Sequence, residues 1–293
     1  MALNKNILLF NNTIYGKLAL VLGIICIAIY MSSDNPANGG TWQGYTLGTL
    51  GTVIIVWLTL LGIRKRSYRS SLGTVQGWTS AHVYLGLVLL LIGTLHCGYQ
   101  FGWNIHTLAY VLMVIVIISG MYGLWLYLML PNSMERNRKN LSRENMLRQF
   151  DHFNQEAVII AADLPADIQN AVGSAIKYTT LGGSAYAQIR AKDSSRVSLD
   201  ASQPLKLVDN RDQQALLSYV AHELPKPKHS TEQHEKLQAL LDILSQRKTL
   251  LNSLRLDMNR QTLLHIWLVV HIPFSIALLG VLTAHIISVF FYW

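Results

Sequence analysis

The chain has 293 residues, of which 51% are hydrophobic and only 14% are charged, whereas about a quarter of the residues of a typical soluble protein are charged. Fifteen of the 16 acidic residues lie between Pro131 and Thr262, and only six of the 24 basic residues lie outside that window. This distribution excludes a wholly soluble enzyme, a disulfide scaffold and a disordered chain, and it predicts an integral membrane protein with one polar segment inserted into it.

Five stretches are apolar and long enough to form candidate membrane spans, since a helix needs about 20 residues to cross a bilayer. The first is short, and we interpret it as an uncleaved span because the following Ser32-Ser33-Asp34 offers no small-x-small cleavage site; a signal peptide is the alternative. The fourth is expected to end at Pro131, which cannot continue a helix. The predicted spans are residues 16–31, 46–63, 79–101, 106–130 and 263–293.

The few basic residues orient these spans, because cytoplasmic loops carry an excess of Lys and Arg. Lys5 and Lys17 precede the first span, and the cluster at 64–69 follows the second. The connections at 32–43 and 102–105 contain neither Lys nor Arg. We therefore expect an inner-membrane protein of a bacterium, with its N-terminus and polar insert in the cytoplasm and its C-terminus outside.

The polar segment is expected to form its own domain, 131–262, of mixed α/β or helical structure, between a membrane part, 1–130, and a last helix, 263–293. It contains no glycine-rich phosphate loop, so a flavin or nicotinamide domain is not expected. Within it we predict a short strand at 157–162, a hairpin-like stretch at 181–189, and helices at 213–224 and 231–260. The second of these helices could run directly into the last span.

The cysteines and the net charge exclude several kinds of site. Cys26 and Cys97 lie in apolar stretches and form no Cys-x-x-Cys pair, which excludes a thiolate zinc site, a cysteine-ligated iron–sulfur cluster and covalently attached haem. Five of the eight net positive charges belong to the membrane part (six basic residues minus one acidic), where basic residues set topology. Nucleic acid is therefore not an expected partner.

Two pairs of histidines carry the functional argument. His82 and His96 lie in the third predicted span, and His271 and His285 lie in the fifth, each pair 14 residues apart. Such an offset turns an α-helix by about 1400°, within roughly 40° of a whole number of turns, and rises about 21 Å. Each pair therefore shares one helix face and places one histidine near each membrane surface.

Ionisable residues inside a membrane are costly and usually functional. A neutral imidazole bonded to a neighbouring helix would explain one isolated histidine, but not the same spacing on two helices. The predicted topology places His82 with His271 near the inner face and His96 with His285 near the outer face. Two facing imidazoles are the axial ligands that a haem iron needs, so we predict two bis-histidine b-type haems.

Three further residues are candidates for the cofactor sites. Gly86 and Gly93 lie on the histidine face of the third span, where missing side chains could leave room for porphyrins; close helix packing is the alternative explanation. His106 opens the fourth span at the outer face. It could bind a quinone oxygen, shuttle a proton or hold a haem propionate, or it could be an ordinary interfacial histidine.

The two His-x13-His pairs, on helices separated by one intervening span, resemble the dihaem four-helix core of cytochrome b in quinol–cytochrome c reductases, and the membrane domain of ferric reductases and NADPH oxidases. In both families two helices supply all four haem ligands, and the resemblance, which covers the second to fifth spans, assigns that role to His82, His96, His271 and His285. The chain departs from these families because it has no C-terminal flavin domain, no Pro-Glu-Trp-Tyr motif and a long insert before the last helix. The resemblance therefore does not identify the electron donor or the electron acceptor of this chain.

The resulting hypothesis is an all-α integral membrane protein whose dihaem helix bundle relays electrons across the bilayer as a subunit of an oxidoreductase complex. Its expected partners are a quinone pool or redox subunit at one face and a c-type cytochrome or iron–sulfur protein at the other. Two alternatives are a self-contained transmembrane reductase of ferric iron or oxygen, and a transporter or scaffold whose histidines relay protons.

Overall fold

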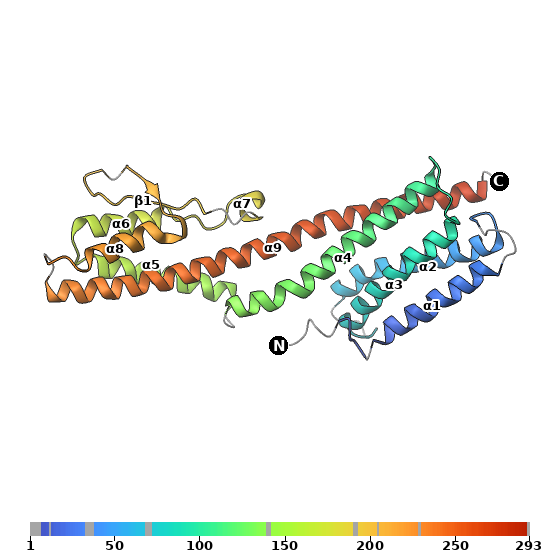
Figure 1. Ribbon diagram of the computed structural model, residues 1–293, viewed down its shortest axis with the longest axis horizontal. Helices are drawn as coiled ribbons and strands as arrows, with labels where there is room; N and C mark the ends of the chain where they lie inside the picture. Colours follow the sequence, from blue (N-terminus) through green and yellow to red (C-terminus); the bar gives the residue numbers. More distant parts are fainter. Residues whose placement is uncertain are drawn as a thin grey trace. The chain divides into compact units, whose positions relative to one another are not determined.

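The computed structural model describes residues 7–11, 13–32, 38–67, 72–138, 142–189, 193–203, 205–227 and 230–291, and within them the protein is mostly helical (Figure 1). The chain divides into two compact units. The first, which we call the membrane unit, comprises Met1–Met129 and Leu264–Trp293, and the second, the polar unit, comprises Leu130–Leu263. The boundaries of the two units thus lie close to the positions where the density of charged residues changes along the sequence.

Five helices contain a stretch long and apolar enough to cross a membrane, which confirms the five predicted spans as candidate membrane helices. Helices suit this environment because hydrocarbon offers no partner to backbone N–H and C=O groups, which must then be bonded within the segment. The five helices are α1 (Ile14–Met31), α2 (Trp42–Arg66), α3 (Val75–Cys97), α4 (Ile105–Arg138) and α9 (Thr231–Phe291).

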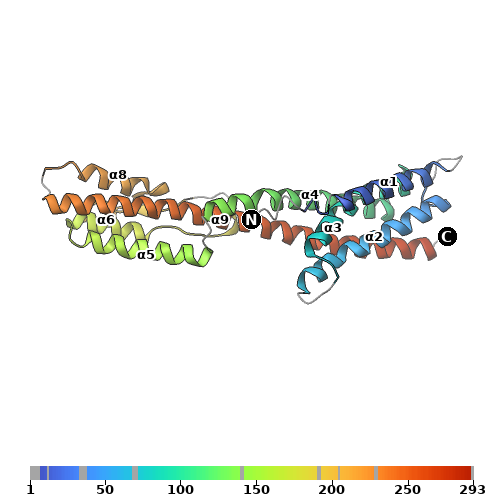
Figure 2. The ribbon, with the colours of Figure 1, turned by 90° about the horizontal axis from the view of Figure 1, so that it is seen from below.

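Within the membrane unit, α3 packs against both α1 and α2 (Figure 1, Figure 2). The shared core takes side chains from each helix, including Cys26 of α1, Leu47 of α2, Ile92 of α3, Met113 of α4 and Leu278 of α9. With lipid outside and apolar side chains inside, such helices are held by close van der Waals contact rather than by expulsion of water.

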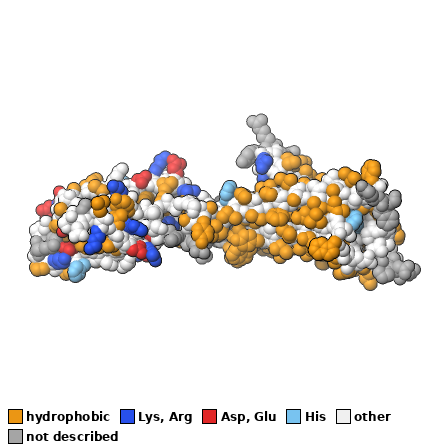
Figure 3. Space-filling model, turned by 90° about the horizontal axis from the view of Figure 1, so that it is seen from above, with side chains coloured by type: hydrophobic (Ala, Val, Ile, Leu, Met, Phe, Trp, Pro, Cys, Tyr) orange, Lys and Arg blue, Asp and Glu red, His pale blue; other side chains and the backbone are white. Residues whose placement is uncertain are grey.

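The outward faces of these helices are apolar. Val53, Ile118 and Ile276, from α2, α4 and α9, are each 60% exposed or more. Hydrophobic side chains cover most of the visible face of the membrane unit in Figure 3. A soluble surface rarely exposes a continuous apolar area of this kind, so the unit fits a lipid bilayer.

The ends of the helices differ from the predicted spans for identifiable reasons. The hydroxyls of Thr41 and Thr74 accept hydrogen bonds from Gly44 N and Gly77 N, so α2 and α3 begin earlier than hydropathy alone predicts. The third span was predicted to reach residue 101, but α3 ends at Cys97. Gly98 follows with φ 56°, a left-handed conformation that commonly terminates helices.

The prediction that the fourth helix ends at Pro131 is wrong, because α4 continues to Arg138. A proline removes one hydrogen bond, here to the carbonyl of Tyr127, but the bonds of the flanking residues survive. The same holds for Pro273, which lies inside α9. The prediction that the helix from residue 231 runs into the last span is confirmed, since α9 is one helix from Thr231 to Phe291.

The polar unit is mainly helical, with one antiparallel pair of two-residue strands in which Arg196 faces Asp209 and Val197 faces Val208. One core joins its elements through Ala157, Ile168, Val197, Leu216 and Leu240. Besides the first part of α9, the elements are α5 (Arg143–Ala161), α6 (Ala166–Lys177), α7 (Ala185–Ile189), β1 (Arg196–Val197), β2 (Val208–Asp209), the 3-10 helix η1 (Arg211–Gln213) and α8 (Gln214–Glu223).

Two predictions within this unit are wrong. The strand expected at 157–162 is the end of helix α5, because a short apolar run does not distinguish a buried strand from a buried helix. Ala157 and Ala161, four residues apart, both face the core. The hairpin expected at 181–189 is instead a turn through Gly182 and Gly183, both with positive φ, followed by the short helix α7.

Candidate functional site

The outer pair of histidines meets within the membrane unit. His96 of α3 and His285 of α9 have ring centroids 6.0 Å apart, with the ring planes nearly perpendicular at 89°. Both side chains are partly buried. Residues 189 positions apart in the sequence are thus brought together as the spacing and orientation of the spans predict.

The inner pair has no such contact. His82 of α3 and His271 of α9 are both partly buried. Among the described residues, neither a ring contact nor a hydrogen bond joins the two side chains. The structure therefore shows the predicted meeting of histidines for His96 and His285.

On α3, both histidines direct Nδ1 at a backbone carbonyl of α2. His82 Nδ1 lies 3.1 Å from Leu58 O, and His96 Nδ1 lies 2.8 Å from Gly44 O. A carbonyl can only accept a hydrogen bond, so Nδ1 carries the hydrogen in both rings and Nε2 keeps its lone pair. This is the tautomer that a metal-ligating histidine needs, with its other ring nitrogen held by the protein.

On α9, the histidines direct Nδ1 at side chains of α4. His271 Nδ1 lies 2.7 Å from Ser119 Oγ, and His285 Nδ1 lies 2.5 Å from Nδ1 of His106. None of the described residues forms a hydrogen bond with Nε2 of any of the four histidines. Across the residues that the structure describes, Nε2 of all four rings therefore has no hydrogen-bond partner.

Glycines of α2 make the position of His96 possible. Gly44 supplies the accepting carbonyl, and a Cβ added at Gly48 would lie only 2.7 Å from Cε1 of His96. The imidazole thus packs directly on the backbone of α2. The Gly-x-x-x-Gly spacing of these two residues is a sequence signal for such close approach that the sequence-based prediction did not use.

A similar arrangement on α4 holds His271. The Trp267 indole lies beside the imidazole, with ring centroids 5.4 Å apart, and donates from Nε1 to Ser119 O at 2.8 Å. A Cβ atom added at Gly123 would overlap Trp267 Cε2, so this glycine leaves room for the indole, whereas one added at Gly120 would lie in ordinary contact with His271 Cε1 at 3.5 Å. One serine therefore anchors two rings of α9.

The two glycines predicted to give cofactor clearance have different surroundings. A Cβ added at Gly86 would meet nothing within 4 Å, so open space adjoins α3 at that point. A Cβ at Gly93 would lie 2.6 Å from Cε of Met113. A side chain of α4 therefore fills the space beside Gly93. This favours close helix packing, the alternative explanation for this glycine, over clearance for a cofactor.

The chemistry and separation of His96 and His285 are compatible with the ligands of a haem iron. Imidazole nitrogens bind zinc at about 2 Å, and a similar bond length to iron would place the centroids of two axial imidazoles about 6 Å apart, as in the outer pair. Haem iron takes only two protein ligands in a bis-histidine site. Within the described parts of the chain, no three His, Cys, Asp or Glu side chains gather as they would in an all-protein metal site.

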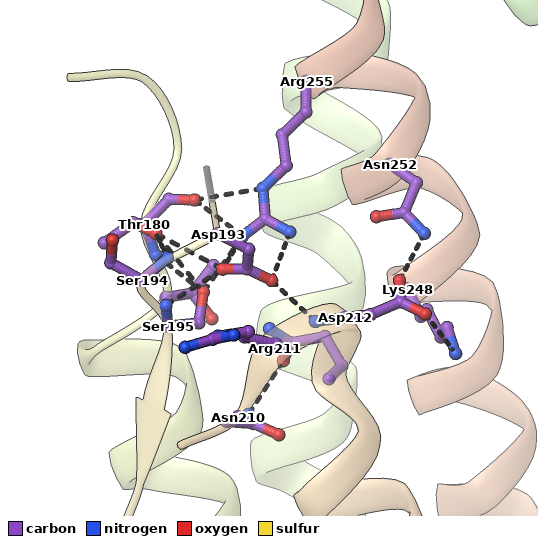
Figure 4. A network of polar contacts seen from close by, with 12 residues as sticks. Thr180, Asp193, Ser194, Ser195, Asn210, Arg211, Asp212, Lys248, Asn252 and Arg255 are labelled. Atoms are coloured by element: carbon purple, nitrogen blue, oxygen red, sulfur yellow. Dashed lines mark hydrogen bonds and ion pairs between the residues drawn. The ribbon is translucent and has the colours of Figure 1, made fainter. Parts of the chain in front are cut away.

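A second cluster of polar side chains lies in the polar unit (Figure 4). Arg255 Nη1 and Nη2 of α9 lie 2.7 Å from Oδ2 and Oδ1 of Asp193, which also accepts from Ser195 N at 2.9 Å and Asp212 N at 2.7 Å. Both oxygens of the carboxylate are thus engaged by protein donors. The cluster ties α9 to the segment before β1, which is a structural role.

No known family model, curated protein or solved structure matches this chain. The resemblance to the cytochrome b and ferric reductase families therefore depends on the four histidines, their spacing and the helices that carry them.

Proposed function

We propose that this chain is a membrane-embedded b-type cytochrome subunit that carries electrons across the bilayer. His82 and His271 would bind the inner of two haems, and His96 and His285 the outer. The observation that carries the proposal is the shared arrangement of the four rings: each directs Nδ1 at a hydrogen-bond partner on a neighbouring helix, and none of the described residues bonds its Nε2.

The haems would supply one-electron redox chemistry. The four histidines would hold the two irons, and with two protein ligands on each iron the haems would relay single electrons rather than bind substrate or oxygen. The bonds of His82 and His96 to carbonyls hold these two rings in one tautomer, and the bonds at Nδ1 of all four histidines orient the rings, which supports metal affinity. Along α3, His82 and His96 are separated by a rise of about 21 Å, most of the roughly 30 Å of the hydrocarbon core.

The hydrogen bonds of His82 and His96 argue against a proton relay through these two rings. Such a relay needs partners that both accept and donate, but His82 and His96 bond backbone carbonyls, which only accept. A proton on either ring has no onward path through that bond. Ser119 and His106, which bond His271 and His285, can both donate and accept, so it is the two histidines of α3 that favour electron transfer here.

Partners and orientation belong to the same proposal. A relay of single electrons needs a donor at one face and an acceptor at the other, and we propose a quinone pool or redox subunit and a c-type cytochrome or iron–sulfur protein. The polar unit would lie in the cytoplasm and serve as a docking or assembly domain. Isolation of the intact complex from its own membranes identifies these subunits, whereas a chain that reduces ferric iron or oxygen alone supports the self-contained reductase instead.

An absorption spectrum of the purified protein tests the central claim. We expect two b-type haems per chain in the wild type and one after His82→Leu, His271→Leu, His96→Leu or His285→Leu. Redox titration should show that the first two variants lose one haem and the last two lose the other. His265→Leu is the matched control, because His265 is an exposed histidine of α9 outside both pairs.

Absence of a b-type spectrum in the wild type would contradict the proposal. Loss of the same haem in His82→Leu and His285→Leu would contradict the pairing.

A further inference from the structure

His106 differs from the other partners of the four histidines. Its Nδ1 lies 2.5 Å from Nδ1 of His285, and the two rings meet edge to face, with centroids 4.5 Å apart and planes at 87°. The other three histidines bond a carbonyl or a serine hydroxyl. The outer pair is therefore the one in which a ring nitrogen of a further histidine, His106, bonds a proposed haem ligand, His285.

We propose that His106 is a positioning residue for His285: it accepts the hydrogen bond from His285 Nδ1 and fixes the ring so that Nε2 is the metal-binding nitrogen. This inference rests on the proposed function.

The direction of this bond follows from the chemistry of imidazole. A neutral ring has one donor nitrogen and one acceptor nitrogen, so two Nδ1 atoms at this distance need one ring of each tautomer. If His285 Nε2 binds a metal, its hydrogen must be on Nδ1. His106 must then accept at Nδ1 and carry its own hydrogen on Nε2, and as an exposed residue it can do so without a buried partner.

The identity of the acceptor has an electronic consequence. An imidazole nitrogen is a stronger base than a backbone carbonyl oxygen, so it draws the hydrogen of His285 more strongly toward itself. Hydrogen bonding of this kind makes a ligating histidine a stronger electron donor to its metal, which favours the oxidised iron. His106 should therefore hold the reduction potential of the outer haem lower than a carbonyl acceptor would.

Two substitutions in the full-length membrane protein test this role. His106→Leu removes the acceptor, whereas His106→Asn keeps an acceptor oxygen near the place of Nδ1 but makes it weaker. We expect both variants to retain two haems, and the midpoint potential of the outer haem to rise in the order wild type, His106→Asn, His106→Leu. The low-field electron paramagnetic resonance line of the outer ferric haem should shift in the same order.

The inner haem in the same samples is the internal control, and His265→Leu is the matched histidine replacement; neither should change. An outer haem with the wild-type potential and spectrum in His106→Leu overturns the inference, as does an equal shift in both variants. Loss of the outer haem in His106→Leu together with its retention in His285→Leu also overturns it, because His106 would then be the ligand. These results all require haem in the wild type, so they are distinct from a failure of the proposed function itself.

Discussion

Single glycines determine where the ring of His96 can lie. Gly48 has no side chain, and the imidazole occupies the space that a Cβ would need. The carbonyl of Gly44, one turn earlier on α2, receives the Nδ1 hydrogen of the same ring. The imidazole is thus packed on the backbone of α2, in a place where any larger residue at Gly48 would displace it.

We expect Gly48→Val to remove the outer haem while the inner haem remains. The added side chain would overlap the His96 ring, which cannot give way without leaving its bond to Gly44 and its position opposite His285. Haem content and the two redox titration steps of the purified protein measure this. Gly62→Val on the same helix is the control, because nothing lies within 4 Å of its Cβ position, and an equal loss in that variant would contradict the steric explanation.

Asp193 is a carboxylate of the polar unit that several hydrogen bonds keep ionised. Burial tends to raise its pKa, but the hydrogen bonds from Ser195 and Asp212 and the charge of Arg255 hold the pKa below the usual value. A carboxyl group with a lowered pKa in the folded state stabilises the fold above its unfolded pKa, and this stabilisation is lost as the pH falls through the folded pKa.

The polar unit should therefore lose stability below about pH 4, the ordinary pKa range of an aspartate. In Asp193→Asn the unit should be less stable at pH 7, and its stability should fall less between pH 5 and pH 3. Amide hydrogen exchange of α9 and the β1 segment in the full-length protein measures both effects. An unchanged pH dependence in Asp193→Asn would show that other groups control acid unfolding.

At the scale of elements, Arg247 joins four parts of the polar unit. It is 1% exposed, and its guanidinium donates to Asn154 of α5, Thr179 after α6 and Gln213 before α8. Its cation also lies 4.9 Å from the ring centroid of Phe150. None of these partners is a carboxylate, so neutral hydrogen-bond acceptors rather than an ion pair satisfy the guanidinium. Burial lowers the pKa of Arg247 to about 10.

We expect Arg247→Met to destabilise the polar unit by about 2–4 kcal/mol, because hydrogen bonds to a charged group each contribute about 1.5–3 kcal/mol and their loss strands buried acceptors. Arg247→Lys should recover little, since an ammonium group lacks the planar fork that reaches three directions. Denaturant unfolding followed by hydrogen exchange in α5, α6 and α8 measures the change. Arg148→Met, at an exposed arginine, should have little effect, and an equal loss there would argue against a special role for Arg247.

At the scale of the whole molecule, the proposed orientation puts two exposed segments on opposite sides of the membrane. Trp103, in the connection between α3 and α4, is fully exposed, and Leu205, in the polar unit, is 90% exposed. In a variant without Cys26 and Cys97, a membrane-impermeant thiol reagent should label Trp103→Cys in intact cells. Leu205→Cys should be labelled only after the membrane is opened, and the reverse pattern would invert the orientation.

Much of the architecture follows from local composition and spacing. Apolar stretches define the membrane helices because hydrocarbon accepts only internally bonded backbone, and the offset of 14 residues puts His82 with His96 on one face of α3. The periodic leucines after residue 231 predict the long α9 for the same local reason. The prediction failed at 157–162 because the same short apolar pattern fits both a strand and a helix. It failed at Pro131 because a helix can continue when one hydrogen bond is lost.

By itself, the sequence determined that this is a membrane protein with a polar insert and which histidines could face one another, since both depend on charge, hydropathy and helical periodicity along the chain. Only the tertiary structure decided which group each histidine's Nδ1 meets, because these partners are carbonyls and side chains of other helices. The positions of Leu58, Gly44, Ser119 and His106 relative to the rings arise from helix packing and register, and no spacing within one helix encodes them.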